Sequence, residues 1–88
     1  MKIKKGFMLR NIGGKHIVVA VGEASKSFNG LIRLNETACF LWEKLVKGSS
    51  KDELVKALTD EYEVDNKTAE ESVDEFINTL KGARLLDE

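Results

Sequence analysis

The side chains that most often perform catalysis or bind metal ions are few in this sequence, and they do not converge. Cys39 is the only cysteine and His16 the only histidine. His16 has no histidine or cysteine at metal-ligand spacing, so we expect a solvated residue beside a turn. Cys39 lies within an apolar helical pattern, which predicts a packed small side chain rather than a reactive thiol. We therefore predict no enzymatic activity, no catalytic residue, no metal site and no cofactor.

Two further kinds of site are disfavoured by their surroundings. Gly13-Gly14 has no G-x-G-x-x-G or Walker pattern around it, so no phosphate-binding loop is predicted. Ser50 begins a helix, as the attachment serine of an acyl carrier does, but GSSKDEL lacks the Asp-Ser-Leu pattern of such carriers. The carboxylates at 70, 71, 74 and 75 are expected to form the solvated face of a helix.

The composition is that of a soluble globular protein. The chain has 88 residues, 42% of them hydrophobic and 33% charged, with no proline, and we expect one domain over residues 1–88. No apolar run is long enough to span a bilayer, and the basic N-terminus is not followed by the apolar stretch of a secretory signal. A single cysteine agrees with a reducing compartment, so we predict a cytoplasmic protein without a membrane partner.

Local patterns predict three strands followed by three helices. Strands are expected at 7–12, 15–21 and 31–34, and helices at 36–47, at 51–62 and from either Asp65 or Thr68 to about Lys81. Asn35 is a good N-cap for the first helix, and Ser50 with Glu53 forms a capping box for the second. The order indicates an α+β, winged-helix-like fold, in which a three-stranded antiparallel sheet precedes a three-helix bundle.

Helical spacing predicts which residues form the core. Trp42 is expected inside, on a first helix whose apolar surface extends to Val46 and which is therefore mostly buried. Tyr62 is expected to face inward from the second helix. The inward face of the third helix is predicted to consist of Ala69, Val73, Phe76, Ile77 and Leu80. Two leucines in the final ARLLDE also require cover.

The charges are unevenly distributed. Residues 1–33 hold seven Lys and Arg against one Glu, whereas residues 34–88 hold seven against fourteen Asp and Glu. The split can reflect two faces that attract each other, or mark the docking site of a charged partner. A winged helix suggests DNA, but the third helix presents Glu70, Glu71, Asp74 and Glu75 where phosphates would lie. We predict no nucleic-acid partner.

The third strand is the last of its meander, so we expect it at an edge of the sheet with one row of backbone groups free. Arg33 and the preceding FNG can protect such an edge against pairing. Alternatively, an extended peptide can add to it as a further strand and place alternate side chains in an adjoining groove.

The run LIRLNETACFLWEKLVKG, with the helices that follow it, resembles the family of pyrroloquinoline quinone (PQQ) synthesis protein D. The resemblance rests on a spaced set of residues within this run: Leu34, Asn35, Glu36, Thr37, Ala38, Trp42 and Gly48. It extends over nearly the whole chain and is least specific before residue 30. Many members of this family serve peptide pathways other than PQQ synthesis.

The resemblance implies a non-catalytic peptide chaperone, also called a recognition element for ribosomally made, modified peptides. Such a domain binds the leader segment of a precursor peptide and presents it to a modifying enzyme, often a radical S-adenosylmethionine enzyme. The leader adds to the third strand and lies beside the third helix. Carried over, the binding positions are Leu31, Ile32, Arg33 and Leu34 on the strand, with Val73, Phe76, Ile77 and Leu80 on the helix. The alternatives are a winged-helix DNA-binding protein and a structural subunit of a larger enzyme.

Overall fold

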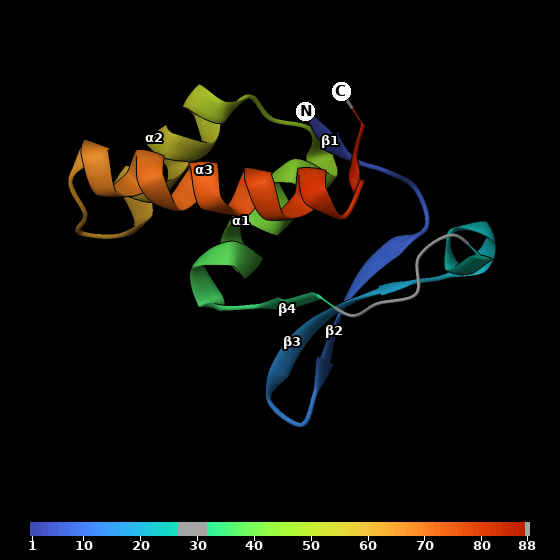
Figure 1. Ribbon diagram of the computed structural model, residues 1–88. Coiled ribbons are helices and arrows are strands. Elements are labelled where there is room, and N and C mark those ends of the chain that lie inside the picture. Colours follow the sequence, from blue (N-terminus) through green and yellow to red (C-terminus); the bar gives the residue numbers. More distant parts are fainter. Residues whose placement is uncertain (27–31, 88) are drawn as a thin grey trace.

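A computed structural model describes residues 1–26 and 32–87, and its elements follow the predicted order with additions at both ends (Figure 1). The elements are β1 (Lys2–Ile3), β2 (Phe7–Ile12), β3 (Lys15–Ala20), a 3₁₀ turn η1 (Gly22–Lys26), β4 (Ile32–Leu34), α1 (Glu36–Lys47), α2 (Lys51–Glu61), α3 (Asn66–Gly82) and β5 (Leu86–Asp87). A three-stranded antiparallel sheet followed by three helices confirms the predicted α+β fold.

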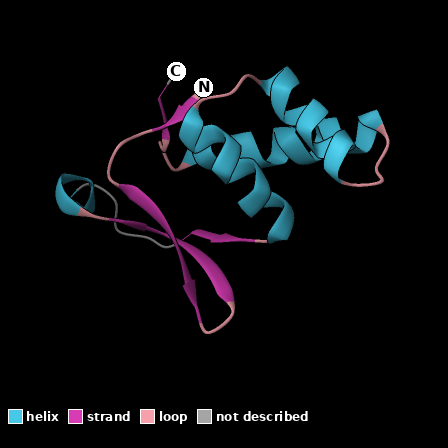
Figure 2. Cartoon of the chain, turned by 180° about the vertical axis from the view of Figure 1, so that it is seen from behind, coloured by secondary structure: helices cyan, strands magenta, loops and turns pink. Residues whose placement is uncertain are grey.

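The sheet has the strand order β2-β3-β4, so β3 is central. Gly13 and Gly14 join β2 to β3 with φ of 60° and 81°, a left-handed turn that glycine adopts without a steric penalty. The Asn11 side chain closes this turn by accepting a hydrogen bond from the Gly14 N–H at 3.1 Å. The resulting hairpin projects away from the helices, as both views show (Figures 1 and 2).

One face of the sheet packs on the helices. Val18 is fully buried and lies opposite Leu9 on β2 and Ile32 on β4. Opposing residues share a face of a sheet, so these three side chains point together into the core. The other face carries the alternate residues, among them Arg10, Ile17 and Arg33, which lie opposite one another across the three strands.

The two chain ends pair with each other, which the sequence patterns did not predict. β1 and β5 form an antiparallel ladder in which Ile3 lies opposite Leu86, and the Lys4 N–H donates to the Leu85 carbonyl at 2.8 Å. Leu85 is fully buried and Leu86 nearly so. This ladder supplies the cover that the two C-terminal leucines require, and it brings β1 and β5 side by side (Figure 1).

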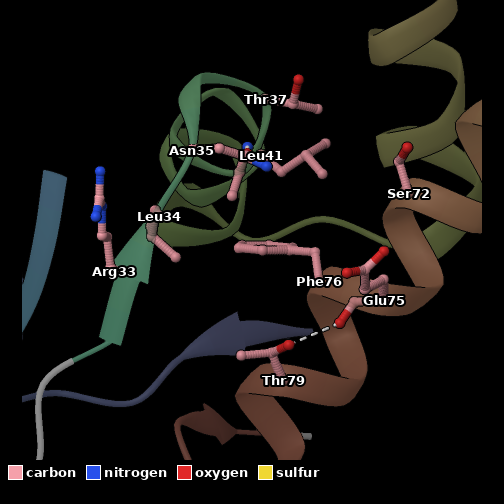
Figure 3. Close-up of a pocket in the computed structure, with 10 residues that line it drawn as sticks. Arg33, Leu34, Asn35, Thr37, Leu41, Ser72, Glu75, Phe76 and Thr79 are labelled. Atoms are coloured by element: carbon pink, nitrogen blue, oxygen red, sulfur yellow. Dashed lines mark hydrogen bonds between the residues drawn. The ribbon is translucent and has the colours of Figure 1, made fainter. Parts of the chain in front are cut away.

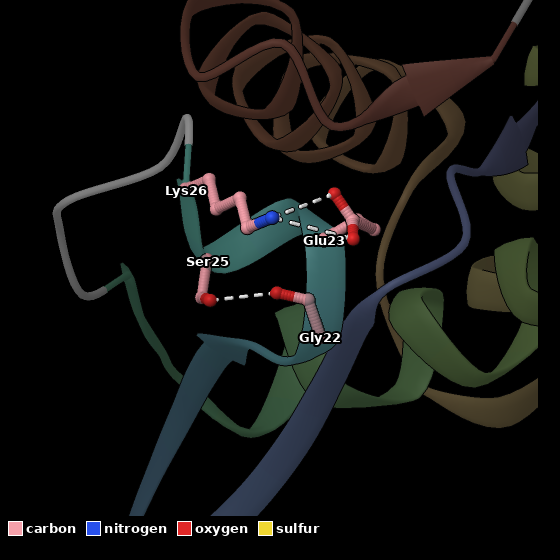
Figure 4. Close-up of polar contacts among 4 residues, drawn as sticks. All are labelled: Gly22, Glu23, Ser25 and Lys26. Carbon is pink, nitrogen blue, oxygen red and sulfur yellow. Dashed lines mark hydrogen bonds and ion pairs between the residues drawn. The ribbon is translucent and has the colours of Figure 1, made fainter.

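Short-range polar contacts hold the turn η1 (Figure 4). The Ser25 hydroxyl donates to the Gly22 carbonyl at 2.6 Å, and Lys26 Nζ lies 3.3 Å from Glu23 Oε2. Both members of this ion pair are largely exposed, so it contributes little to stability.

Each helix begins at a capping residue. The Asn35 side chain accepts from the Ala38 N–H at 2.8 Å, and Ser50 and Glu53 form the predicted reciprocal capping box. Of the two candidates for the third helix, Asp65 is the cap, accepting from the Thr68 N–H at 2.7 Å. Hydrogen bonds from the Thr68 side chain and backbone hold the Asp65 pKa below its usual value. The stabilisation from this cap is therefore present at neutral pH and is lost as the pH falls through that lowered pKa.

The core lies between the helices and the inner face of the sheet. Trp42 is 3% exposed and packs with the fully buried Leu41 and Leu45. Two predictions of inward residues were wrong: Val46 is 49% exposed and Tyr62 is 37% exposed. Val46 lies beyond the stripe that α1 buries, and the expectation of a mostly buried helix was also wrong, since its buried residues are Leu41, Trp42 and Leu45. Tyr62 is the C-cap of α2, where its ring meets Phe40 edge-on with centroids 5.6 Å apart.

The burial of Trp42 leads to a stability prediction with a control on the same helix. Trp42→Ala should lower the free energy of unfolding by about 3–5 kcal/mol, because it leaves a large cavity in a small core. Val46→Ala, on an exposed side chain of α1, should change it by less than about 0.5 kcal/mol. Urea unfolding followed by circular dichroism measures both. A folded Trp42→Ala protein with the stability of Val46→Ala would contradict the core assignment.

Candidate functional site

β4 is an edge strand with an unpaired side. Its three residues pair with β3 in the register His16 to Leu34, Ile17 to Arg33 and Val18 to Ile32. Among the described residues no strand pairs with its other side. Backbone N–H and C=O groups alternate in direction along a strand, so part of this short row faces outward and is available to another chain.

A hollow of about 220 Å³ lies between β4, the start of α1 and α3 (Figure 3). Three structural elements contribute its ten lining residues. They are Arg33, Leu34 and Asn35 from β4 and its end, Thr37, Ala38 and Leu41 from α1, and Ser72, Glu75, Phe76 and Thr79 from α3. The outward side of the strand therefore borders a ready-made cavity.

The apolar part of the hollow is formed by core side chains. Leu34 points toward the Phe76 ring, and Leu41 lies above it (Figure 3). Leu34 is 5% exposed, Phe76 is 5% exposed and Leu41 is fully buried. These side chains form a well-packed floor that is held by the rest of the core and is therefore rigid.

The α3 wall follows from helical spacing. Ser72, Glu75, Phe76 and Thr79 stand at i, i+3, i+4 and i+7, so they share one face of the helix. Phe76 belongs both to this face and to the buried face. The Thr79 hydroxyl donates to the Glu75 carbonyl at 3.0 Å, which satisfies it within the helix (Figure 3). The wall is thus polar along its outer part and aromatic at its base.

The structure brings only part of the sequence-predicted site together. Arg33, Leu34 and Phe76 line the hollow, and Ile32 lies half-buried on the same strand. Leu31 lies outside the described residues. The other three predicted positions do not line the hollow and are buried in the core: Val73 and Leu80 are fully buried and Ile77 is 6% exposed. Peptide contact at all eight positions stays a prediction.

Sequence reasoning missed seven residues that line the hollow: Asn35, Thr37, Ala38, Leu41, Ser72, Glu75 and Thr79. The available signal was the start of α1, because a helix that begins directly after an edge strand places its first turn beside that edge. On α3 the signal was the row of polar residues Ser72, Glu75 and Thr79, which lies beside the apolar stripe on the helix surface.

A second, more open hollow of about 550 Å³ adjoins the end of β4. Its lining includes Lys15 and His16 at the start of β3 and Glu36 at the start of α1; the remaining lining residues are Gly14, Arg33, Leu34 and Asn35. Arg33, Leu34 and Asn35 line both hollows, so the two cavities meet around the same three residues.

Neither hollow contains a nucleophile paired with a base. The Cys39 thiol is outside both, and partial burial, with the charges of Glu43 and Glu36, raises its pKa. Over residues 1–26 and 32–87 no group of three or more His, Cys, Asp and Glu side chains is placed to hold a metal ion. None of the helices in this part of the chain is long and apolar enough to cross a membrane.

The exposed face of α3 does not suit DNA. Glu70, Glu71, Asp74 and Glu75 are all exposed on it, and the nearby Lys51 is engaged with Asp74, with its Nζ 2.7 Å from Oδ1. That contact with Asp74 raises the Lys51 pKa, so the lysine stays charged and neutralises one of the four carboxylates. The remaining carboxylates would repel a phosphate backbone.

Comparison with known proteins identifies the family. The family model described as coenzyme PQQ synthesis protein D (PqqD) matches residues 15–86, and the chain belongs to this family. Among curated protein sequences none matches the chain significantly.

Two solved structures share the fold. One is described as TbiB1 in complex with the TbiA(beta) leader peptide; it has a TM-score of 0.76 and 24% sequence identity, over 99% of this chain and 95% of that one. The other is a lasso peptide synthetase B1 complexed with the leader peptide, with a TM-score of 0.70 and 21% identity over 92% and 89% of the two chains. At these identities the likeness establishes the fold.

The raised pKa of Cys39 predicts a thiol that reacts slowly with alkylating agents. At pH 8 the folded protein should be alkylated by iodoacetamide more slowly than the protein in urea, because burial and two neighbouring carboxylates disfavour the thiolate. Mass spectrometry at successive times measures the two rates, and Cys39→Ala serves as the unlabelled control. Equal rates in the folded and unfolded protein would contradict the packed assignment.

Proposed function

We propose that this chain is a non-catalytic recognition domain for ribosomally made, modified peptides, formed by residues 1–88 as one unit. In this proposal the leader segment of a precursor peptide adds as a strand to the free side of β4 and lies beside α3. The observation that carries the proposal is the hollow that opens from the unpaired side of β4 and is walled by α3. Family membership and the leader-peptide complexes of the two structural neighbours support it.

Strand addition explains how affinity and sequence selectivity come from different parts of the site. Backbone hydrogen bonds to β4 are independent of the peptide's side chains, so they supply affinity without selecting a sequence. Alternate side chains of an added strand point to the same side. One apolar side chain of the peptide would then enter the hollow over Leu34 and Phe76 and supply the selection.

The size of the site implies moderate affinity. A cavity of about 220 Å³ accommodates one side chain rather than several. A flexible leader also loses conformational freedom when it becomes a strand, at a cost of about 2–5 kcal/mol of the gross interaction energy. We therefore expect a complex that forms and releases readily, which suits a domain that passes its peptide to an enzyme.

The enzyme partner that we propose is a peptide-modifying enzyme, with radical S-adenosylmethionine enzymes as the leading class because the family resemblance implies them. PQQ is one of the products that the family resemblance implies. We place this action in the cytoplasm, since the one cysteine cannot form an internal disulfide. A structural subunit of a larger enzyme would instead show no affinity for a free peptide, and a DNA-binding protein would shift duplex DNA in a salt-sensitive manner.

Titration with a leader peptide tests the proposal residue by residue. The probe is a synthetic leader segment of a candidate precursor peptide from the same genome, added to ¹⁵N-labelled protein. Backbone amide shifts should cluster on residues 31–34 and 70–81, because strand addition changes the hydrogen bonding of β4 and the packing on α3. Shifts confined to other parts of the molecule, or no binding at millimolar peptide, would refute the proposed site.

A pair of variants on α3 provides the matched test. Thr79→Trp places a large side chain in the hollow and should weaken peptide binding at least about tenfold, since a bulky group there costs at least about 1.4 kcal/mol of binding energy. Asn78 is also exposed, is adjacent in sequence and does not line the hollow, so Asn78→Trp should bind as the unaltered protein does. Isothermal titration calorimetry measures both. Equal affinities would place the peptide elsewhere.

A further inference from the structure

The second hollow has no role in the proposed strand addition, yet it adjoins the path of the peptide. The pair His16 to Leu34 is the last in the β3–β4 ladder. Beyond it the chain leaves the sheet through Asn35 and enters α1, while β3 extends further to Lys15. The hollow occupies this corner, and Lys15 lines it without lining the first hollow.

Two cations stand at this corner on the same face of the sheet. Arg33 lies opposite Ile17, and Lys15 is two residues before Ile17, so Lys15 and Arg33 are diagonal neighbours. Both are exposed. In the described part of the chain neither forms an ion pair with a carboxylate, the ion pairs found there being Lys26 with Glu23 and Lys51 with Asp74.

The start of α1 and the side chain of Glu36 also affect the potential at this corner. The start of α1 turns its N-terminal end, which carries a partial positive charge, toward the same corner. Glu36 opposes this potential, and as the first residue of α1 its negative charge is offset in part by that helix end, which carries about half a unit of positive charge. The corner therefore retains two cationic side chains without an acidic partner.

We propose that this second hollow receives a carboxylate side chain of the bound peptide, an Asp or Glu held by Lys15 and Arg33. The inference rests on the proposed function, because it concerns the same peptide on β4. Since Arg33, Leu34 and Asn35 line both hollows, the second opens beside the same end of β4 that the peptide would cover. Leu34 and the two cations lie on opposite faces of the sheet. Successive side chains of a strand alternate between faces, so the acidic residue lies an odd number of positions, about one or three, from the apolar residue that fills the first hollow.

The position of the acid also reports the direction of the bound strand. The second hollow adjoins the C-terminal end of β4. An acid on the N-terminal side of the apolar residue therefore corresponds to a peptide antiparallel to β4, and one on the C-terminal side to a parallel peptide.

The proposal is tested by selecting binders from a phage-displayed library of random 16-residue peptides. The unaltered protein should select peptides with an apolar residue and an Asp or Glu about one or three positions to one side. Lys15→Glu should lose this acidic preference, because it reverses the charge of the hollow. Arg10→Glu is the matched control: Arg10 is a cation on the same face of the sheet that lines neither hollow, so its selected peptides should retain the acid.

A peptide selected in this way then gives the quantitative test. Changing its acidic residue to the corresponding amide should weaken binding to the unaltered protein about threefold to fivefold, as expected for a partly exposed ion pair. The same change should have no effect on binding to Lys15→Glu. Peptides that share an apolar residue but no acid, or an acidic preference that survives Lys15→Glu, would overturn the inference and leave the proposed function standing. Failure to select any peptide that competes for β4 would contradict both.

Discussion

The placement of the candidate site depends on the hydrogen bond that the Ala38 N–H donates to the Asn35 side chain, at 2.8 Å. This cap ends a three-residue strand and begins a helix with no residue between Asn35 and either element. Because the strand and the helix are joined so tightly, the packing of α1 through Leu41, Trp42 and Leu45 also fixes the position of β4. The strand is too short to be stable by itself. The core holds α1, and α3 packs on α2 and into the same core, so the hollow lies between β4, the start of α1 and α3.

Phe76 shows how a small domain can use one residue both for stability and for a binding surface. An 88-residue chain has a limited core. The ring of Phe76 lies at the boundary between this core and the hollow, where Phe76 is 5% exposed. The neighbours of Phe76 divide the two roles: Val73 and Leu80 are fully buried, whereas Ser72 and Thr79 line the open side. The apolar floor is therefore preorganised. In the proposed complex, most of the conformational entropy lost on binding is that of the peptide.

The sequence was sufficient to predict the three strands of the sheet and the three helices, because each has a local signal. The caps of the first two helices were predicted outright, whereas Asp65 was one of two candidates for the third. Asn35, Ser50 and Asp65 are capping residues whose side chains reach their own backbone, and Gly13-Gly14 dictates a hairpin. The β1–β5 ladder could not be predicted, since two strands of two residues have no periodicity and their pairing joins opposite ends of the chain. The lining of the hollow was predicted only in part for a similar reason. Helical spacing identifies the buried stripe of α3, but which polar residues beside it meet β4 depends on how α1 and α3 pack together.

The central claim of the account is that a peptide pairs with the outward side of β4, and direct contacts in the complex test this best. The measurement is an isotope-filtered nuclear Overhauser experiment on ¹³C,¹⁵N-labelled protein bound to an unlabelled leader peptide. The account predicts backbone contacts between the peptide and residues 32–34, together with contacts from a peptide side chain to the Phe76 ring. Contacts confined to β2 or to the exposed surface of α2, with none to residues 32–34, would contradict it.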